Sequence, residues 1–263
     1  MGPVRGSVGR MALGIALVAG AIAAAGAAAA PKAGVTEVSS PASAANRMHG
    51  VVFSILPNGH TRTCSGTVVH SKYKSLVWTA GGCVADPATH RFLTKVVFVP
   101  AYRDGEAPFK RWSAKALFAK SDFIQNGNRK LDYGGILVER RELNGHTRSL
   151  EGVVGSLNLE VNKSRNRTLN AIGYPVHSPY DGKREYRCTA KPDGTDSPGG
   201  TGPRTSRLPC AANSASPGAG WVDGKNLFSV TGYTHSNDPG HVFGAYFDDQ
   251  AKALYDFAAA QKP

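Results

Sequence analysis

Short hydrophobic runs alternate with polar, turn-forming segments along the first half of the chain. Between residues 48 and 140 these runs read GVVFSIL, CSGTVVH, SLVWTA, LTKVVFVP, KALFAK and YGGILVE. They are rich in Val, Ile, Leu and Phe, and Gly, Pro, Asn and Asp separate them. Such runs at close spacing are typical of antiparallel strands in a barrel or sandwich. We therefore predict an all-β N-terminal half at about 47–140.

A second set of strand-like runs follows between residues 153 and 247. It reads VVGSLNLEV, TLNAIGYP, EYRCTA, GAGWVDG, NLFSVTGYT and VFGAYF. The segment RELNGHTRSLEG between the two sets shows neither the helical nor the strand period, so we expect it to connect two halves. The second half is predicted to be a β unit of similar size at about 150–247.

One helix is predicted, over residues 248–261, and we expect it to pack on the outside of the second half. Asp248 is a candidate N-cap, and the apolar positions at helical spacing are Ala251, Leu254, Tyr255 and Ala258. Residues 190–209 are so rich in Gly, Pro and Ser that a long surface loop without regular structure is expected there.

The N-terminal region differs in composition from the rest. Residues 1–30 carry Arg5 and Arg10 before an Ala- and Gly-rich apolar stretch, and small residues then offer a cleavage site after Ala30. This pattern predicts a secretory signal peptide rather than a membrane anchor, because the stretch is weakly hydrophobic and no basic stop follows. Residues 31–46 are small, polar and Pro-containing, which predicts a flexible linker before a domain at 47–263.

Four cysteines lie in the predicted secreted part, and an even number in an exported chain indicates two disulfides. Three pairings are possible. We expect the pairs nearest in sequence, Cys64–Cys83 and Cys188–Cys210, each stabilising the fold by about 3 kcal/mol through loop closure. No spacing of Cys and His resembles a metal site, so neither a metal nor a cofactor is expected.

The chain of 263 residues has a formal net charge of +12, which falls to about +10 without Arg5 and Arg10. The basic residues are scattered and form no helix-length stripe, so no nucleic-acid partner is expected. A solvated basic surface is the favoured interpretation. The alternative is a weak electrostatic contact with an anionic cell-wall polymer.

Several motifs resemble those of the trypsin/chymotrypsin-like serine peptidases, in particular their secreted bacterial members. These motifs are CSGTVV at Cys64–Val69, TAGGC at Thr79–Cys83, DYGG from Asp132 and CAANSASPGAGW at Cys210–Trp221. The resemblance covers roughly residues 46–260. It implies two six-stranded antiparallel β-barrels with a cleft between them and a C-terminal helix, in agreement with the predicted strands.

The resemblance also assigns catalytic positions, and two of them carry unexpected residues. The general base would stand at Gly82, the triad acid at Asp132 and the nucleophile at Pro217. Glycine has no imidazole to accept a proton, and proline has no hydroxyl to attack with. Each loss alone costs several orders of magnitude in rate.

The resemblance places three further departures in the cleft. An oxyanion hole needs the backbone N–H of the nucleophile residue, which Pro217 lacks. The second donor belongs to Ala215, where the family has Gly. The strand that pairs with a bound peptide has Gly232 and Thr234 in place of the family's Ser and Gly, and Thr234 is expected to crowd the specificity pocket.

From these departures we expect a secreted peptidase homologue that is not an enzyme and that binds an unidentified protein or peptide ligand. One alternative is an active endopeptidase with a non-standard site, using Ser214 or Ser216. Another is a basic structural protein associated with the cell wall. In each case the protein is expected to be extracellular and not integral to a membrane.

Overall fold

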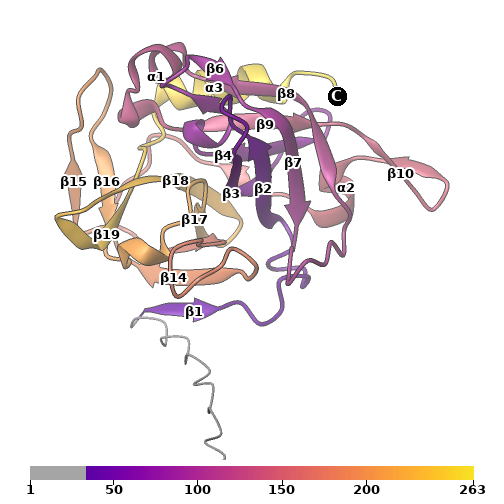
Figure 1. Ribbon diagram of the computed structural model, residues 1–263, viewed down its shortest axis with the longest axis horizontal. Coiled ribbons are helices and arrows are strands. Elements are labelled where there is room, and N and C mark those ends of the chain that lie inside the picture. The colour runs from indigo at the N-terminus through magenta and orange to yellow at the C-terminus, as the bar shows by residue number, and fades with distance from the viewer. Residues whose placement is uncertain (1–33) are drawn as a thin grey trace, which may run out of the picture.

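The computed structural model describes residues 34–263, and the predicted signal peptide over 1–30 lies outside the described residues. The chain forms two β units side by side (Figure 1). Three short α-helices accompany them: α1 (Ser121–Asn126), α2 (Leu150–Val154) and α3 (Asp249–Ala259). The predicted all-β, trypsin-like fold class with a C-terminal helix is confirmed, although only the first unit is the predicted closed six-stranded barrel and the second is a nine-stranded sheet.

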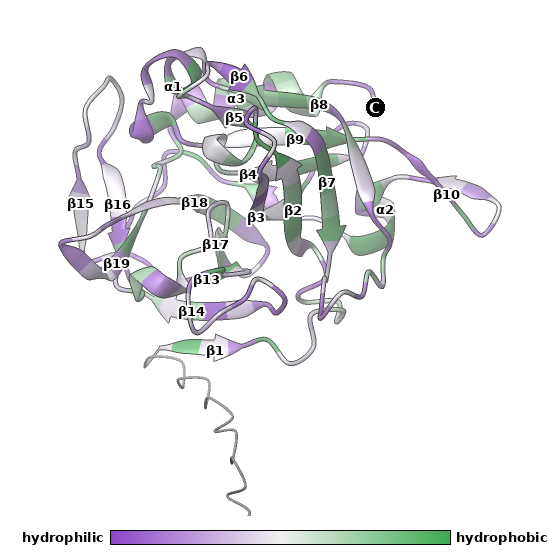
Figure 2. Ribbon diagram, in the orientation of Figure 1, coloured by the Kyte–Doolittle hydropathy of each residue, from purple (hydrophilic) through white to green (hydrophobic). Residues whose placement is uncertain are grey.

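The first unit is a closed six-stranded barrel with the order β2-β3-β4-β9-β8-β7. Its strands are β2 (His49–Ile55), β3 (Thr61–Val69), β4 (Leu76–Thr79), β7 (Thr94–Pro100), β8 (Trp112–Ala119) and β9 (Gly134–Val138). All neighbours in the barrel are antiparallel. The hydrophobic residues gather on these strands, most visibly on β7 (Figure 2), and fill a core that contains Trp78, Phe98 and Trp112.

The second unit is a nine-stranded sheet with the order β1-β14-β13-β17-β18-β19-β16-β15, and β12 pairs with β18 beside this path. Its strands are β1 (Val35–Glu37), β12 (Asn158–Leu159), β13 (Leu169–Gly173), β14 (Tyr186–Ala190), β15 (Gly194–Asp196), β16 (Thr205–Leu208), β17 (Gly220–Asp223), β18 (Asn226–His235) and β19 (Asp238–Gly244). Trp221 is the largest side chain in its core.

Two small hairpins lie outside these units. They are β5 (Ala85–Asp86) with β6 (Arg91–Phe92), and β10 (Arg141–Leu143) with β11 (His146–Arg148). The second lies in the segment expected to be an irregular connection. Asn144 and Gly145 form its turn with φ angles of 52° and 75°, the left-handed geometry that an Asn-Gly pair favours.

Both disulfides join the cysteines nearest in sequence, as predicted. Cys64 bonds to Cys83 and ties β3 to the loop after β4. Cys188 bonds to Cys210 and ties β14 to the segment that leads into β17. Disulfides persist in oxidising compartments, so the pair indicates an extracellular protein.

Three expectations about local structure need correction. The described part of the predicted linker over 31–46 includes β1, which pairs with β14, and both Val35 in this strand and Val38 just after it are buried. The predicted loop over 190–209 contains the hairpin β15–β16, because polar contacts fix it to the β18–β19 hairpin.

The third correction concerns α3, which packs on the first barrel rather than on the second half. The Trp78 and Tyr255 rings lie 6.0 Å apart, and those of Phe118 and Phe257 lie 5.8 Å apart. Figure 1 shows α3 beside β8. Asp248 caps the helix as expected, since its Oδ1 accepts hydrogen bonds from the N–H groups of Gln250 and Ala251.

Candidate functional site

The candidate site lies where three loops and one strand meet. Gly82 is in a 3₁₀ turn after β4 (Gly81–Cys83), and Asp132 directly follows another (Arg129–Leu131) before β9. Pro217 lies between a third turn (Ala212–Ser214) and β17, while Gly232 is in β18. The first two positions belong to the barrel and the last two to the second sheet.

The positions expected for the triad base and acid are in direct contact. The N–H of Gly82 donates to Asp132 Oδ1 over 2.9 Å, and the Arg62 guanidinium donates to the Gly82 carbonyl oxygen. The Cys64–Cys83 disulfide fixes the next residue of this turn. Glycine has no side chain, so position 82 contacts Asp132 through its backbone amide alone.

Asp132 is only 6% exposed, and this burial sets its acidity. Burial raises the pKa of the Asp132 carboxyl to about 6, because a carboxylate loses hydration in the interior. The N–H groups of Gly82 and Gly81 and the charges of Arg129 and Arg62 offset part of the rise. The carboxyl thus titrates two units above its ordinary range.

The space around the site differs sharply between its two glycines. A Cβ added at Gly82 would find Arg62 Nη1 at 3.7 Å and Asp132 Oδ1 at 3.9 Å, which are ordinary contacts. A Cβ added at Gly232 would lie 2.7 Å from Asp132 Oδ2 and force a shift. A side chain can therefore be accommodated at position 82, whereas β18 approaches the carboxyl too closely at position 232.

Pro217 is held against the barrel by its neighbours. Its carbonyl oxygen accepts the Ser65 N–H over 2.8 Å. The next residue, Gly218, has φ of +81°, and a Cβ there would lie 2.1 Å from the Ser65 carbonyl oxygen, so only glycine fits. The Gly218 N–H donates to the Thr231 carbonyl oxygen over 2.7 Å, which brings the Pro217 loop beside β18.

Neither expected oxyanion donor is free. Pro217 has no N–H, and the Ala215 N–H donates to the Ala212 carbonyl oxygen over 3.0 Å within the 3₁₀ turn. Ala215 itself is buried. An oxyanion hole needs donors directed at the reacting oxygen, and this turn directs its N–H back into the chain.

The two serines considered as substitute nucleophiles are engaged in other contacts. Ser216 is 2% exposed, and its Oγ lies 2.6 Å from Ser65 Oγ and 2.9 Å from the Tyr174 carbonyl oxygen. Ser214 Oγ donates to the Ala211 carbonyl oxygen over 2.6 Å. Among residues 34–263, no hydrogen bond joins a histidine ring to a serine.

The rim of the cleft carries a network that sequence reasoning did not find. His235 Nε2 and the Tyr233 hydroxyl each lie 2.8 Å from Asp196 Oδ2, and these contacts lower the pKa of the Asp196 carboxyl although its partial burial raises it. Thr234 lies half-buried between the two ring-bearing residues. No sequence pattern marked Asp196 as part of this network, because it lies in a Gly-, Pro- and Ser-rich segment.

Ser65 is a second residue that sequence reasoning missed. Its N–H, carbonyl and hydroxyl contact Pro217, Thr79 and Ser216 respectively, so it organises the junction of the two units. Its position directly after Cys64 in the CSGTVV motif was the available signal.

Metal and membrane chemistry find no support in the described part of the chain. No group of three His, Cys, Asp or Glu side chains is placed to hold a metal ion there. Within the same residues, no helix has the length and hydrophobicity needed to cross a bilayer.

Comparison with known proteins gives structural relatives only. No protein-family model matches the chain, and no curated protein matches it. The solved structure of the protease Anisep from Arthrobacter nicotinovorans is 30% identical, with a TM-score of 0.71 over 82% of this chain and 96% of that one. The thermostable serine protease AL20 from an extremophilic microorganism is 28% identical, with a TM-score of 0.72 over 82% and 99%.

A third structure shows the fold alone. It is that of the scabies mite inactivated protease paralogue S-I1, which is 16% identical, with a TM-score of 0.55 over 76% of this chain and 90% of that one.

The comparisons overturn the expectation that this chain is not an enzyme. The two structures that share 28–30% identity with it over most of its length are both those of proteases. Its fold agrees with theirs at TM-scores of 0.71 and 0.72. The chain belongs to the family of bacterial trypsin/chymotrypsin-like serine proteases.

Proposed function

We propose that this member of the serine protease family binds an extended protein or peptide segment in the cleft between its two β units, in a binding or regulatory role. The observation that carries the proposal is the contact between Gly82 and Asp132, in which position 82 offers the carboxyl only its backbone N–H and no side chain. The hydrogen bonds of Ala215 and Ser216 support it further, since both groups are held in the fold.

The free edge of β18 supplies the binding surface in this proposal. β17 pairs with β18 only as far as Val230, and β19 covers the opposite edge as far as His235. Among the described strands, none pairs with the β17-side edge of 232–235. An extended segment can add to such an edge through main-chain hydrogen bonds, while side-chain contacts provide selectivity.

The same fold occurs in an inactivated protease paralogue. The scabies mite paralogue S-I1 keeps this fold at 16% identity. That likeness concerns the fold, and the proposal for this chain depends on its own residues.

The test selects binders from a random peptide library on the immobilised protein and locates them by amide hydrogen exchange. We expect slower exchange at 232–235. Protection confined to another surface would contradict the proposed groove. Rapid cleavage of the selected peptides would show that the cleft acts on its ligand rather than holding it.

A further inference from the structure

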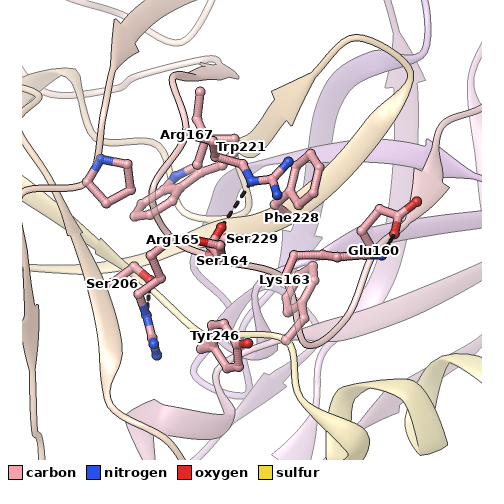
Figure 3. Close-up of a pocket in the computed structure, with 13 residues that line it drawn as sticks. Glu160, Lys163, Ser164, Arg165, Arg167, Ser206, Trp221, Phe228, Ser229 and Tyr246 are labelled. Atoms are coloured by element: carbon pink, nitrogen blue, oxygen red, sulfur yellow. Dashed lines mark hydrogen bonds and ion pairs between the residues drawn. The ribbon is translucent and has the colours of Figure 1, made fainter.

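A row of basic side chains lies on the second sheet, in the loop between β12 and β13. Lys163, Arg165 and Arg167 alternate with polar residues there. The guanidinium of Arg165 lies 4.0 Å from the ring centroid of Tyr246, and that of Arg167 lies 4.1 Å from that of Phe228. Figure 3 shows these side chains around one pocket with Trp221. The aromatic rings hold the two arginines in fixed positions.

The cations of this region differ in whether a carboxylate balances them. Lys163 Nζ lies 3.2 Å from Glu160, and Arg167 Nη1 lies 3.8 Å from Asp223. Arg165 and Arg204 have no carboxylate oxygen within 4.0 Å among residues 34–263. These two arginines therefore form the uncompensated part of the cluster.

Arg165 and Arg204 are instead fixed by neutral groups. Arg165 donates from Nε to the buried Ser206 hydroxyl over 3.0 Å and from Nη2 to the Arg204 carbonyl oxygen over 2.6 Å. Arg204 donates from Nε to Thr195 Oγ1 over 2.7 Å. A guanidinium carries five N–H groups, so each arginine keeps donors available for a ligand.

The electrostatics of the pair favour an anion. Arg165 is half-buried, and its burial lowers the pKa of its guanidinium; Tyr246 offsets part of this effect, and the nearby charge of Arg204 adds to it. A partly desolvated cation beside a like charge is unfavourable unless an opposite charge approaches. An anion that contacts both arginines would remove this cost.

The size of the pocket decides where such a ligand sits. Its enclosed volume is about 20 Å³, which is room for about one water molecule. A tetrahedral anion is too large for this space, and Arg204 does not line it, so such a ligand must lie outside the pocket, on the surface where Arg204 is exposed. A phosphate group directs its oxygens several ways and can bridge two guanidinium planes that different partners orient, whereas a carboxylate is planar.

We propose that Arg165 and Arg204 form a binding site for a phosphate group, either free or carried by an anionic polymer outside the cell. The site needs no contribution from the cleft between the two β units. In this proposal, part of the chain's positive charge acts at one specific site rather than over the whole surface.

The test titrates the purified protein with inorganic phosphate and with poly(glycerol phosphate), following the arginine Nε–H signals by NMR. We expect saturable shifts at Arg165 and Arg204 and at least a tenfold weaker affinity in Arg165→Gln. The matched control is Arg148→Gln, which removes the same charge from the exposed strand β11 and should change affinity less than twofold. Tighter binding of the polymer assigns the site to polymer phosphate, and equal affinity assigns it to the free ion.

Three outcomes would overturn the site. Equal weakening in both variants would mean a diffuse charge effect. Shifts that do not saturate would mean no site. Poly-glutamate binding with the same dependence on Arg165 would remove the phosphate assignment. A thermal melt of each variant shows that Arg165→Gln still folds, and Arg165→Lys, which keeps the charge without the fork, should recover only part of the affinity.

Discussion

At the scale of single residues, Asp132 is a buried carboxyl group with a raised pKa. It is buried, it accepts the Gly82 N–H, and β18 approaches its other oxygen so closely that a Cβ at position 232 would lie 2.7 Å from it. The carboxyl group is kept in place by main-chain contacts alone, without an imidazole. Its acidity and the room at position 82 each lead to a test.

The first test uses the pH dependence of stability. The pKa of Asp132 is about 6 in the folded protein and 3.8 for an exposed carboxyl, as in the unfolded chain. Ionisation of this group therefore lowers the free energy of unfolding as the pH rises from about 4 through 6. Asp132→Asn removes this cost and keeps an oxygen for the Gly82 N–H. We expect the variant to match the wild type below pH 4 and to be about 3 kcal/mol more stable at pH 8.

Urea unfolding from pH 3 to 8 measures this difference. Glu106→Gln, on an exposed side chain, is the control and should change stability by less than about 0.5 kcal/mol at any pH. A constant difference across the range would mean that the carboxyl of Asp132 titrates normally.

The second test restores the expected base with Gly82→His, since the space at position 82 admits a side chain. We expect hydrolysis of a fluorogenic peptide to stay at least about a hundredfold below that of Anisep, because the Ala215 N–H still donates to Ala212. Activity equal to that of Anisep would show that this turn opens when substrate binds.

At the scale of elements, α3 depends on one capping residue. Asp248 accepts two main-chain hydrogen bonds at the start of the helix, and its loss leaves both N–H groups without that partner. Asp248→Ala should destabilise the protein by about 1 kcal/mol, and Asp248→Ser should recover most of the loss. Thermal unfolding monitored by circular dichroism measures both variants, and an unchanged midpoint in Asp248→Ala would contradict the role of the cap.

The elements also show what the sequence could and could not predict. The strands, the helix start at Asp248 and both disulfides depend on local pattern, and they were predictable. The side on which α3 packs depends on Trp78 and Phe118, which no local pattern links to it. The hairpin β15–β16 depends on contacts of Asp196 with Tyr233 and His235, so its composition alone predicted a loop.

The candidate site also has features that the sequence could predict and features that it could not. The resemblance to a family assigned Gly82, Asp132 and Pro217 to one site. In the structure these residues lie in loops where the two β units meet. The hydrogen bond between the Ala215 N–H and Ala212 could not be read from residue types, because it depends on how the turn closes. The same holds for Ser216, whose burial depends on Ser65 in the other β unit.

At the scale of the whole molecule, a small polar network joins the two β units. Ser65 in the barrel accepts the Tyr174 N–H over 2.8 Å and contacts Ser216 Oγ over 2.6 Å, and both partners belong to the second unit. Ser65→Ala would leave the buried Tyr174 N–H without this acceptor. An unsatisfied buried donor costs about 1–3 kcal/mol, so we expect a loss of that size.

A matched control for Ser65→Ala exists in the same barrel. Ser54 is equally buried, at 1% exposure, but its Oγ has no hydrogen-bond partner among the described residues. Ser54→Ala should therefore leave the free energy of unfolding unchanged or raise it, because no partner loses a bond. Urea unfolding of the two variants separates a specific junction between the units from a general effect of removing buried hydroxyls. Equal losses in both would mean that the Ser65 network adds nothing to the way the two units hold together.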